Sequence, residues 1–156
     1  MTEVAIVQFR RRDVLQRSGV MAALAGAGLL AGRDARAADD ELAFGAVSMP
    51  EALRALGGIP AVDREIVLTL PDLAENGAVV PVTVESHLPG TRDIFIVVEA
   101  NPNPMVVRFT FPEGTEPFVS TRIKMAQTSQ VYAVVRAEGR LYAARRETQV
   151  IVGGCG

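Results

Sequence analysis

The spacing of apolar residues changes along the chain, and this change predicts a short helix followed by a sheet. Between residues 42 and 56 the apolar positions recur at helical intervals. Ser48, Pro50 and Glu51 favour a helix start, and Gly57-Gly58 favours its end. The predicted apolar face, which we expect to pack against a sheet, comprises Leu42, Ala46, Met49, Leu53 and Leu56.

From Glu65 onward the apolar positions alternate and are rich in β-branched side chains, which is typical of strands. Turn-forming pairs such as Asn76-Gly77, Pro89-Gly90 and Glu138-Gly139 separate the runs. Seven short strands at this spacing, after a short N-terminal helix, predict an all-β, immunoglobulin-like sandwich of about 100 residues. The predicted strands cover residues 65–70, 78–87, 93–100, 104–111, 118–126, 130–138 and 140–152.

The alternation also predicts which side chains are buried. One strand would bury Met105, Val107, Phe109 and Phe111, opposite Arg108 and Thr110. The next would bury Val119, Thr121, Ile123 and Met125, opposite Ser120, Arg122 and Lys124. The run from Ile94 to Val98 is apolar at every position, and an exposed edge of that kind would need a partner surface.

The first 37 residues have the pattern of a cleavable export signal. Arg11 and Arg12 precede fifteen uncharged residues, Ser18 to Gly32, an order similar to that of twin-arginine signals. Ala35-Arg36-Ala37 is a small-x-small motif, so we expect cleavage before Ala38 and a periplasmic location. A spanning helix needs roughly 20 predominantly apolar residues, which disfavours a stable membrane anchor.

Charge and length restrict the possible functions further. The whole chain has a net charge of −2, and the signal region holds six arginines against three acidic residues, which leaves −5 for the remainder. Nucleic-acid binding relies on clustered Lys and Arg, so we expect no nucleic-acid partner. A chain of 156 residues can bury one core but hardly two. We expect one domain, residues 38–152, and a terminal arm, residues 153–156.

The only cysteine of the chain stands in a tail that has almost no side chains. Gly153, Gly154 and Gly156 surround Cys155. Because glycine leaves the backbone free, we expect a flexible arm that holds the thiol on the order of 10 Å beyond the sheet. A thiol on a slim arm can enter a narrow channel in another protein.

Cys155 lacks the neighbours of a self-sufficient nucleophile. An ordinary thiol, with a pKa of about 8.5, is only a few per cent thiolate at neutral pH. One Cys and one His cannot supply the four ligands of a zinc site. His87 could in principle serve as a base, but a surface position at a strand end is the better interpretation. Tyr132 and Tyr142 are interpreted as packing groups, and we expect no catalytic residue, metal or cofactor.

Three functions therefore stay open on residue chemistry alone. The glycine setting favours a covalent carrier. An unpaired cysteine in an exported protein also fits a periplasmic interaction module whose thiol only forms intermolecular disulfides. A thiol hydrolase or transferase that acts alone with His87 is the third, and the mobile arm disfavours it.

Together with the export signal, four segments of the chain resemble the SoxY family of the sulfur-oxidising Sox system. The resemblance implies a carrier, not an enzyme, whose Cys155 is loaded with thiosulfate as an S-thiosulfonate. The family commonly ends with two glycines after the cysteine, whereas this chain has one. The matching segments are Ala74-Glu75-Asn76-Gly77 with Val80-Pro81, Asn101-Pro102-Asn103-Pro104, Ser120-Thr121-Arg122-Ile123 and Gly153-Gly154-Cys155-Gly156.

The same resemblance implies a set of partners. The first is a SoxZ-like subunit of immunoglobulin-like fold, which forms a heterodimer with the carrier, so that one export signal serves two folded chains. A heme-containing SoxAX-type enzyme would load the thiol. A SoxB-type hydrolase would then release sulfate, and a SoxCD-type dehydrogenase would oxidise the sulfane sulfur that remains.

Overall fold

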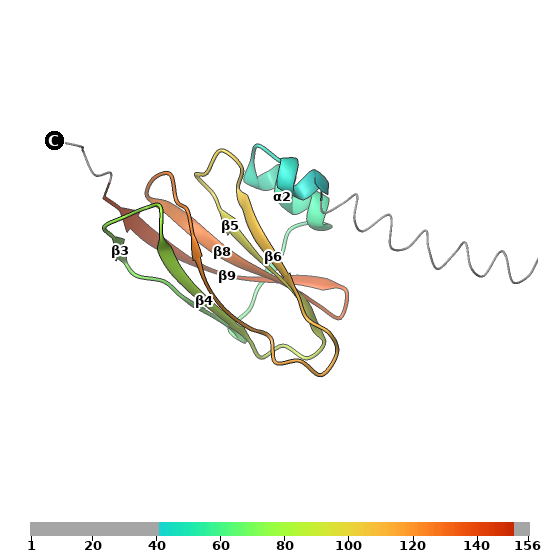
Figure 1. The fold of residues 1–156 in the computed structure, drawn as a ribbon. Helices are drawn as coiled ribbons and strands as arrows, with labels where there is room; N and C mark the ends of the chain where they lie inside the picture. Colours follow the sequence, from blue (N-terminus) through green and yellow to red (C-terminus); the bar gives the residue numbers. More distant parts are fainter. Residues whose placement is uncertain (1–40, 152–156) are drawn as a thin grey trace, which may run out of the picture. The chain divides into compact units, whose positions relative to one another are not determined.

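The structure, a computed structural model, describes residues 41–151, in which nine strands form two sheets (Figure 1). The larger sheet has the order β1-β9-β8-β5-β6, with β3 also paired to β9, and the smaller has the order β2-β4-β7. The elements are α2 (Met49–Leu56), β1 (Ala61–Val62), β2 (Ile66–Thr69), β3 (Leu73–Ala74), β4 (Val80–Ser86), β5 (Thr91–Val98), β6 (Met105–Thr110), β7 (Phe118–Ile123), β8 (Ser129–Ala137) and β9 (Arg140–Val150).

The predicted export signal with Arg11 and Arg12, and the glycine arm with Cys155, lie outside the described residues. Residues 41–45 are helical, and no helix between residues 41 and 151 is long and apolar enough to cross a membrane.

The all-β prediction is confirmed, and each of the seven predicted strands is present. The structure adds β1 and β3, which both pair with β9 in parallel. Each has only two residues, too few to show a period of two. The predicted last strand ends at Val150 rather than at residue 152. The immunoglobulin-like topology stays a prediction.

The main core lies between the two sheets. Strand β4 alternates between buried and more exposed positions, as a strand with one covered face should. Its valines face the inward side chains of β5 and β8 in the larger sheet. The fully buried members of this core are Val80, Val82, Val84, Ile94, Ile96, Val98, Val131, Ala133 and Val135.

Strand β5 lies inside the larger sheet, between β8 and β6, so the predicted need for a partner surface over Ile94 to Val98 is wrong. Both faces of β5 are covered. Ile94 and Ile96 face the smaller sheet, whereas Phe95 and Val97 pack with α2 residues such as Leu53. A strand buried on both faces is apolar throughout, because neither face meets water.

The helix is where it was expected, but its start differs from the predicted capping box. Ser48 occupies the cap position without a side-chain hydrogen bond, and Glu51 Oε2 accepts from the backbone N–H of Val47 at 3.3 Å. Non-helical residues 46–48 interrupt the helical period. Leu42 is therefore exposed, against the prediction, and Ala43 is buried in its place. Gly57 ends α2 with a left-handed φ of 113°.

Met105 of β6 is buried, but the prediction that it shares a face with Val107, Phe109 and Phe111 is wrong. The pairing of β5 with β6 shifts between Ile96 and Val97, so Ile96 pairs with Val107 but Val97 pairs with Met105. One residue, Val106, is extra on β6, and a one-residue slip moves a side chain to the opposite face. Met105 accordingly packs with α2 instead of with Val107. The predicted inward side chains of β7 are confirmed at Val119 and Ile123.

A buried carboxylate connects the helix to the sheet. Asp93 is 4% exposed, and its Oδ1 accepts hydrogen bonds from Arg108 and from the Thr110 hydroxyl. Its Oδ2 lies 3.4 Å from Arg136 Nη1, and Arg136 Nη2 donates to the Leu56 carbonyl at the end of α2. A single carboxylate thus pairs with two arginines, and through Arg136 it connects the last turn of the helix to the sheet.

Candidate functional site: the root of the C-terminal arm

Both sides of β9 are hydrogen-bonded at its C-terminal end, which is the point where the cysteine arm begins. On the β3 side, the Gln149 N–H donates to the Asp72 carbonyl at 2.9 Å, and the Ile151 N–H donates to the Ala74 carbonyl at 3.0 Å. On the β8 side, the Val150 N–H donates to Thr128 Oγ1 at 3.0 Å. The backbone is therefore fixed as far as Ile151, the last described residue.

Side chains hold the segment around β3 against β9. Thr148 is fully buried, and its hydroxyl donates to the Pro71 carbonyl at 3.0 Å. Arg146 Nη2 lies 2.8 Å from Asp72 Oδ1. A two-residue strand has few backbone hydrogen bonds of its own, so the buried Thr148 contact adds to its attachment, and the exposed ion pair adds a little more.

Gly77 closes the loop that follows β3. Its carbonyl accepts the Met125 N–H at 2.7 Å, and Asn76 Oδ1 accepts the Ala78 N–H at 2.9 Å, which confirms the predicted Asn76-Gly77 turn. A Cβ on residue 77 would lie 2.5 Å from the Met125 carbonyl oxygen and 2.8 Å from Val150 Cγ1. Only glycine allows this close approach to the end of β9.

Replacing Gly77 with Ala should destabilise the fold by about 1 to 3 kcal/mol, because the added methyl group overpacks a contact with backbone on one side. Urea denaturation measures the change in the free energy of unfolding. Gly45→Ala is the matched control, since a Cβ there meets nothing within 4 Å. Equal stability of the two variants would contradict the assigned role of Gly77.

Asn101 joins the β5–β6 turn to the same end of the sandwich. Its Nδ2 donates to the Lys124 carbonyl at 2.8 Å, and its Oδ1 accepts the Ala126 N–H at 2.9 Å. Met125 lies between these two contacts and bonds to Gly77. The turn that begins at Asn101 therefore supports the loops around the arm root.

His87, considered from the sequence as a base and interpreted as a surface residue, lies at the opposite end of the fold. It follows the end of β4, whereas the start of β4 adjoins the Gly77 loop. Six residues of strand separate Val80 from Ser86, roughly 20 Å at 3.3 Å per residue. His87 Nε2 lies 3.3 Å from Glu85 Oε1, and half of the His87 side chain is exposed. These contacts fit the surface position that the sequence favoured.

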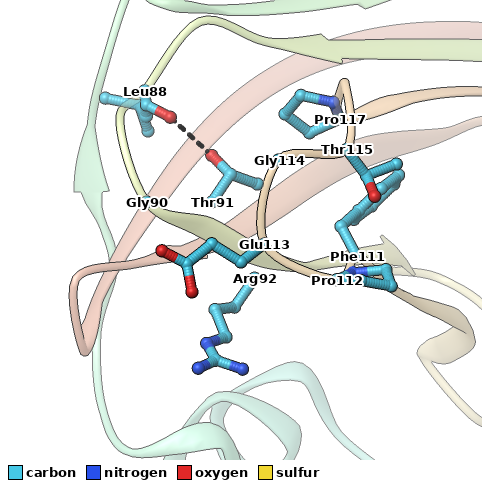
Figure 2. Close-up of a pocket in the computed structure, with 10 residues that line it drawn as sticks. All are labelled: Leu88, Gly90, Thr91, Arg92, Phe111, Pro112, Glu113, Gly114, Thr115 and Pro117. Atoms are coloured by element: carbon cyan, nitrogen blue, oxygen red, sulfur yellow. Dashed lines mark hydrogen bonds between the residues drawn. The ribbon is translucent and has the colours of Figure 1, made fainter.

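A pocket of about 410 Å³ is also distant from the arm root (Figure 2). The β4–β5 turn and the β6–β7 loop form it, and Figure 2 shows Arg92 and Glu113 beside it and the Thr91 hydroxyl bonded to the Leu88 carbonyl. Thr91 pairs with Ala137, just before β9 begins. The length of β9, roughly 33 Å, therefore separates this pocket from the arm root.

The remaining side chains considered from the sequence have structural contacts. Tyr132 donates its hydroxyl hydrogen to Glu99 Oε2 at 3.3 Å, and Tyr142 packs on the core between the sheets. Among residues 41–151, no group of three or more His, Cys, Asp or Glu side chains could hold a metal ion.

Comparisons with known proteins agree with this architecture. Residues 53–155 match the family model of the sulfur oxidation protein SoxY. The structure of the sulfur carrier protein SoxY from Chlorobium limicola f thiosulfatophilum is 41% identical, with a TM-score of 0.58 over 65% of this chain and 94% of that chain. No curated protein matches the sequence.

A superoxide reductase (neelaredoxin) from Ignicoccus hospitalis is 22% identical, with a TM-score of 0.50 over 56% of this chain and 81% of that chain. At this identity the likeness shows a shared fold alone. The SoxY match, by contrast, spans nearly the whole described domain and continues through residue 155. The chain belongs to the SoxY family of sulfur oxidation proteins.

Proposed function

We propose that this protein carries sulfur intermediates of thiosulfate oxidation as covalent adducts of Cys155 and presents them to partner enzymes. Its family is one of sulfur carriers, and the family match runs through residue 155, the only cysteine. This coincidence carries the proposal. Only sulfur among the side-chain atoms of this chain can form a reversible bond to another sulfur atom, and Cys155 is the only thiol.

The loading step is an oxidation that joins two sulfur atoms. The Cys155 thiol and thiosulfate lose one proton and two electrons, and a bond forms between Sγ and the outer sulfur of thiosulfate. The electrons pass to a heme-containing partner. Water then cleaves the bond between the sulfane sulfur and the sulfonate, which releases sulfate and a proton and leaves a persulfide on Cys155.

The folded domain contributes to this chemistry by fixing the point from which the thiol extends. Hydrogen bonds fix β9 as far as Ile151, and Cys155 follows four residues later. Four extended residues span roughly 13 to 14 Å, so the thiol reaches that far from a fixed point. His87 and the pocket of Figure 2 both lie beyond this reach. Neither of them can therefore act on the thiol, and in this proposal the partner enzyme supplies the groups that activate it.

The remaining parts of the proposal come from the sequence and its resemblance. Residues 1–37 would direct twin-arginine export to the periplasm, and residues 38–152 would form an immunoglobulin-like carrier domain. Its partners would be a SoxZ-like subunit, a SoxAX-type loading enzyme, a SoxB-type hydrolase and a SoxCD-type dehydrogenase. The carrier itself would perform no catalysis.

Intact-mass measurement tests the proposal directly. After incubation with thiosulfate, the oxidising partner and an electron acceptor, the protein should gain the mass of one thiosulfate, and the fragment that contains Cys155 should hold it. A reducing agent should remove the adduct, because the bond is a sulfur–sulfur bond. The only product could instead be a protein dimer that a reducing agent converts back to monomer. In that case Cys155 only forms intermolecular disulfides, and the carrier proposal is wrong.

A further inference from the structure

Three exposed apolar side chains belong to segments that meet at the root of the arm. Leu73 in β3 is 51% exposed, Ile151 is 49% exposed and Val79 is 49% exposed. Leu73 is in register with Gln149, two residues before Ile151, so the Leu73 and Ile151 side chains emerge on the same face of the sheet. Val79 belongs to the loop whose Gly77 approaches Val150. We call these three residues the apolar collar.

The collar has a fixed geometry relative to the start of the arm. Leu73 is held because its neighbours Asp72 and Ala74 accept the N–H groups of Gln149 and Ile151. Strand β3 lies beside the C-terminal end of β9 (Figure 1). A partner that contacts the collar therefore meets the arm from a defined direction.

The length of the arm specifies what must cover the collar. Cys155 lies only four residues beyond Ile151. An active site that acts on the thiol must therefore lie within roughly 14 Å of Ile151. Active sites that shelter reactive intermediates lie below the surface of the enzyme. When the short arm enters such a site, the enzyme surface around the channel mouth must contact the carrier residues near Ile151.

We infer that the apolar collar is the docking surface for the enzymes that act on Cys155, and that each of them presents apolar side chains around the mouth of its active-site channel. This inference rests on the proposed function. It explains why three large apolar side chains are left half exposed at this end of the fold, where burial would otherwise stabilise the domain.

The surroundings of the collar suit a contact that forms and dissociates repeatedly. Asp72 and Arg146 neutralise each other beside Leu73, and Glu75 lies exposed at the edge. A small apolar centre with a polar rim is the usual composition of a short-lived interface. A carrier that visits several enzymes in turn needs such an interface, because tight binding to one would prevent transfer to the next.

The test measures the loading of Cys155 by the heme-containing partner at increasing carrier concentration. Leu73→Ser should raise KM about fivefold, because docking would bury the exposed half of the leucine, and Leu73→Ser with Ile151→Ser should raise it roughly tenfold or more. The value of kcat should not change, because the arm and thiol are intact. Val79→Ser is a second single variant of the collar, and it should also raise KM without changing kcat.

Val62→Ser is the matched control, since Val62 is 84% exposed and pairs with Ala143 on the same edge of β9. Seven residues separate Ala143 from Val150, roughly 23 Å along the strand, which is beyond the reach of the arm. Its KM should equal that of the unmodified protein. A small aromatic disulfide should modify Cys155 at the same rate in every variant.

The outcomes separate the two proposals. Unchanged KM in the collar variants, with normal loading, would overturn the docking inference and leave the carrier function intact. Equal increases in the collar variants and in Val62→Ser would also overturn it, because the effect would then follow general surface polarity. If the unmodified protein is not loaded at all, the proposed function fails, and the docking inference fails with it.

Discussion

Cys155→Ser is expected to abolish loading completely, with no thiosulfate adduct detectable by intact mass. A serine hydroxyl cannot form the sulfur–sulfur bond, and the chain has no second cysteine to replace it. The fold should be unaffected, because the substituted residue lies four positions beyond Ile151, whose N–H bonds to the Ala74 carbonyl at the end of the described domain. A variant that still gained the mass of thiosulfate would place attachment elsewhere and contradict the proposed function.

Shortening the arm provides the control for this prediction, because it keeps the thiol and changes only its reach. Deletion of Gly153 and Gly154 would remove roughly 7 Å of extended chain. Loading by the partner enzyme should then fall strongly, whereas a small thiol reagent should still modify Cys155. Normal enzymatic loading of the shortened protein would show that the thiol does not need to enter a channel.

Asp93→Ala is expected to cause the largest loss of stability of any single substitution among the described polar residues. The change leaves Arg108 and Arg136 without their shared carboxylate and frees the Thr110 hydroxyl. Removal of one partner of a fully buried ion pair typically costs 3 to 5 kcal/mol. Because both arginine side chains are about one-fifth exposed and regain some water, we expect about 2 to 4 kcal/mol here.

The Phe95 ring, which contacts both arginines, adds to the expected loss of stability in Asp93→Ala. The guanidinium carbons of Arg108 and Arg136 lie 5.6 Å and 5.1 Å from the centre of the Phe95 ring. Without Asp93, the two guanidinium groups should repel each other and move away from the Phe95 ring. Arg136 should then lose its hydrogen bond to the Leu56 carbonyl. The end of α2 should then exchange its amide hydrogens faster, which hydrogen exchange measures.

Asp72→Ala is the matched control for Asp93→Ala in urea denaturation. Asp72 also pairs with an arginine, Arg146 at 2.8 Å, but its side chain is 86% exposed. Exposed ion pairs are typically worth less than about 1 kcal/mol, so the control should change the free energy of unfolding by no more than that. Similar losses in the two variants would show that burial of Asp93 does not determine its contribution.

Much of the strand arrangement could be predicted from the sequence, because alternation within a strand is a local property. The inward side chains Val119 and Ile123 of β7 were placed correctly, since every second residue of a strand meets the same face. Cys155 could also be proposed as the attachment site from the sequence alone. Its chemistry depends on being the only thiol in a tail of glycines, and both facts are visible in the chain.

The support of the arm root could not be predicted, because its contacts join residues distant in sequence. Thr148 bonds to a carbonyl 77 residues away, and Val150 bonds to a side chain 22 residues away. Asp72, Thr128 and Leu73 carry no motif of their own. Gly77 could be identified as a turn residue, but not as the residue that packs on Val150.

The sequence by itself determined where the seven longer strands run, which side chains of β7 point inward, and that the chain has a single thiol available to be proposed as the sulfur carrier. Only the tertiary structure decided that Ile94 to Val98 form an interior strand, that a bulge turns Met105 toward the helix, and that His87 lies far from the end of β9, where the arm begins. The physical reason is that side-chain alternation arises within one strand, whereas strand order, register and the neighbours of a given end depend on contacts across the whole chain.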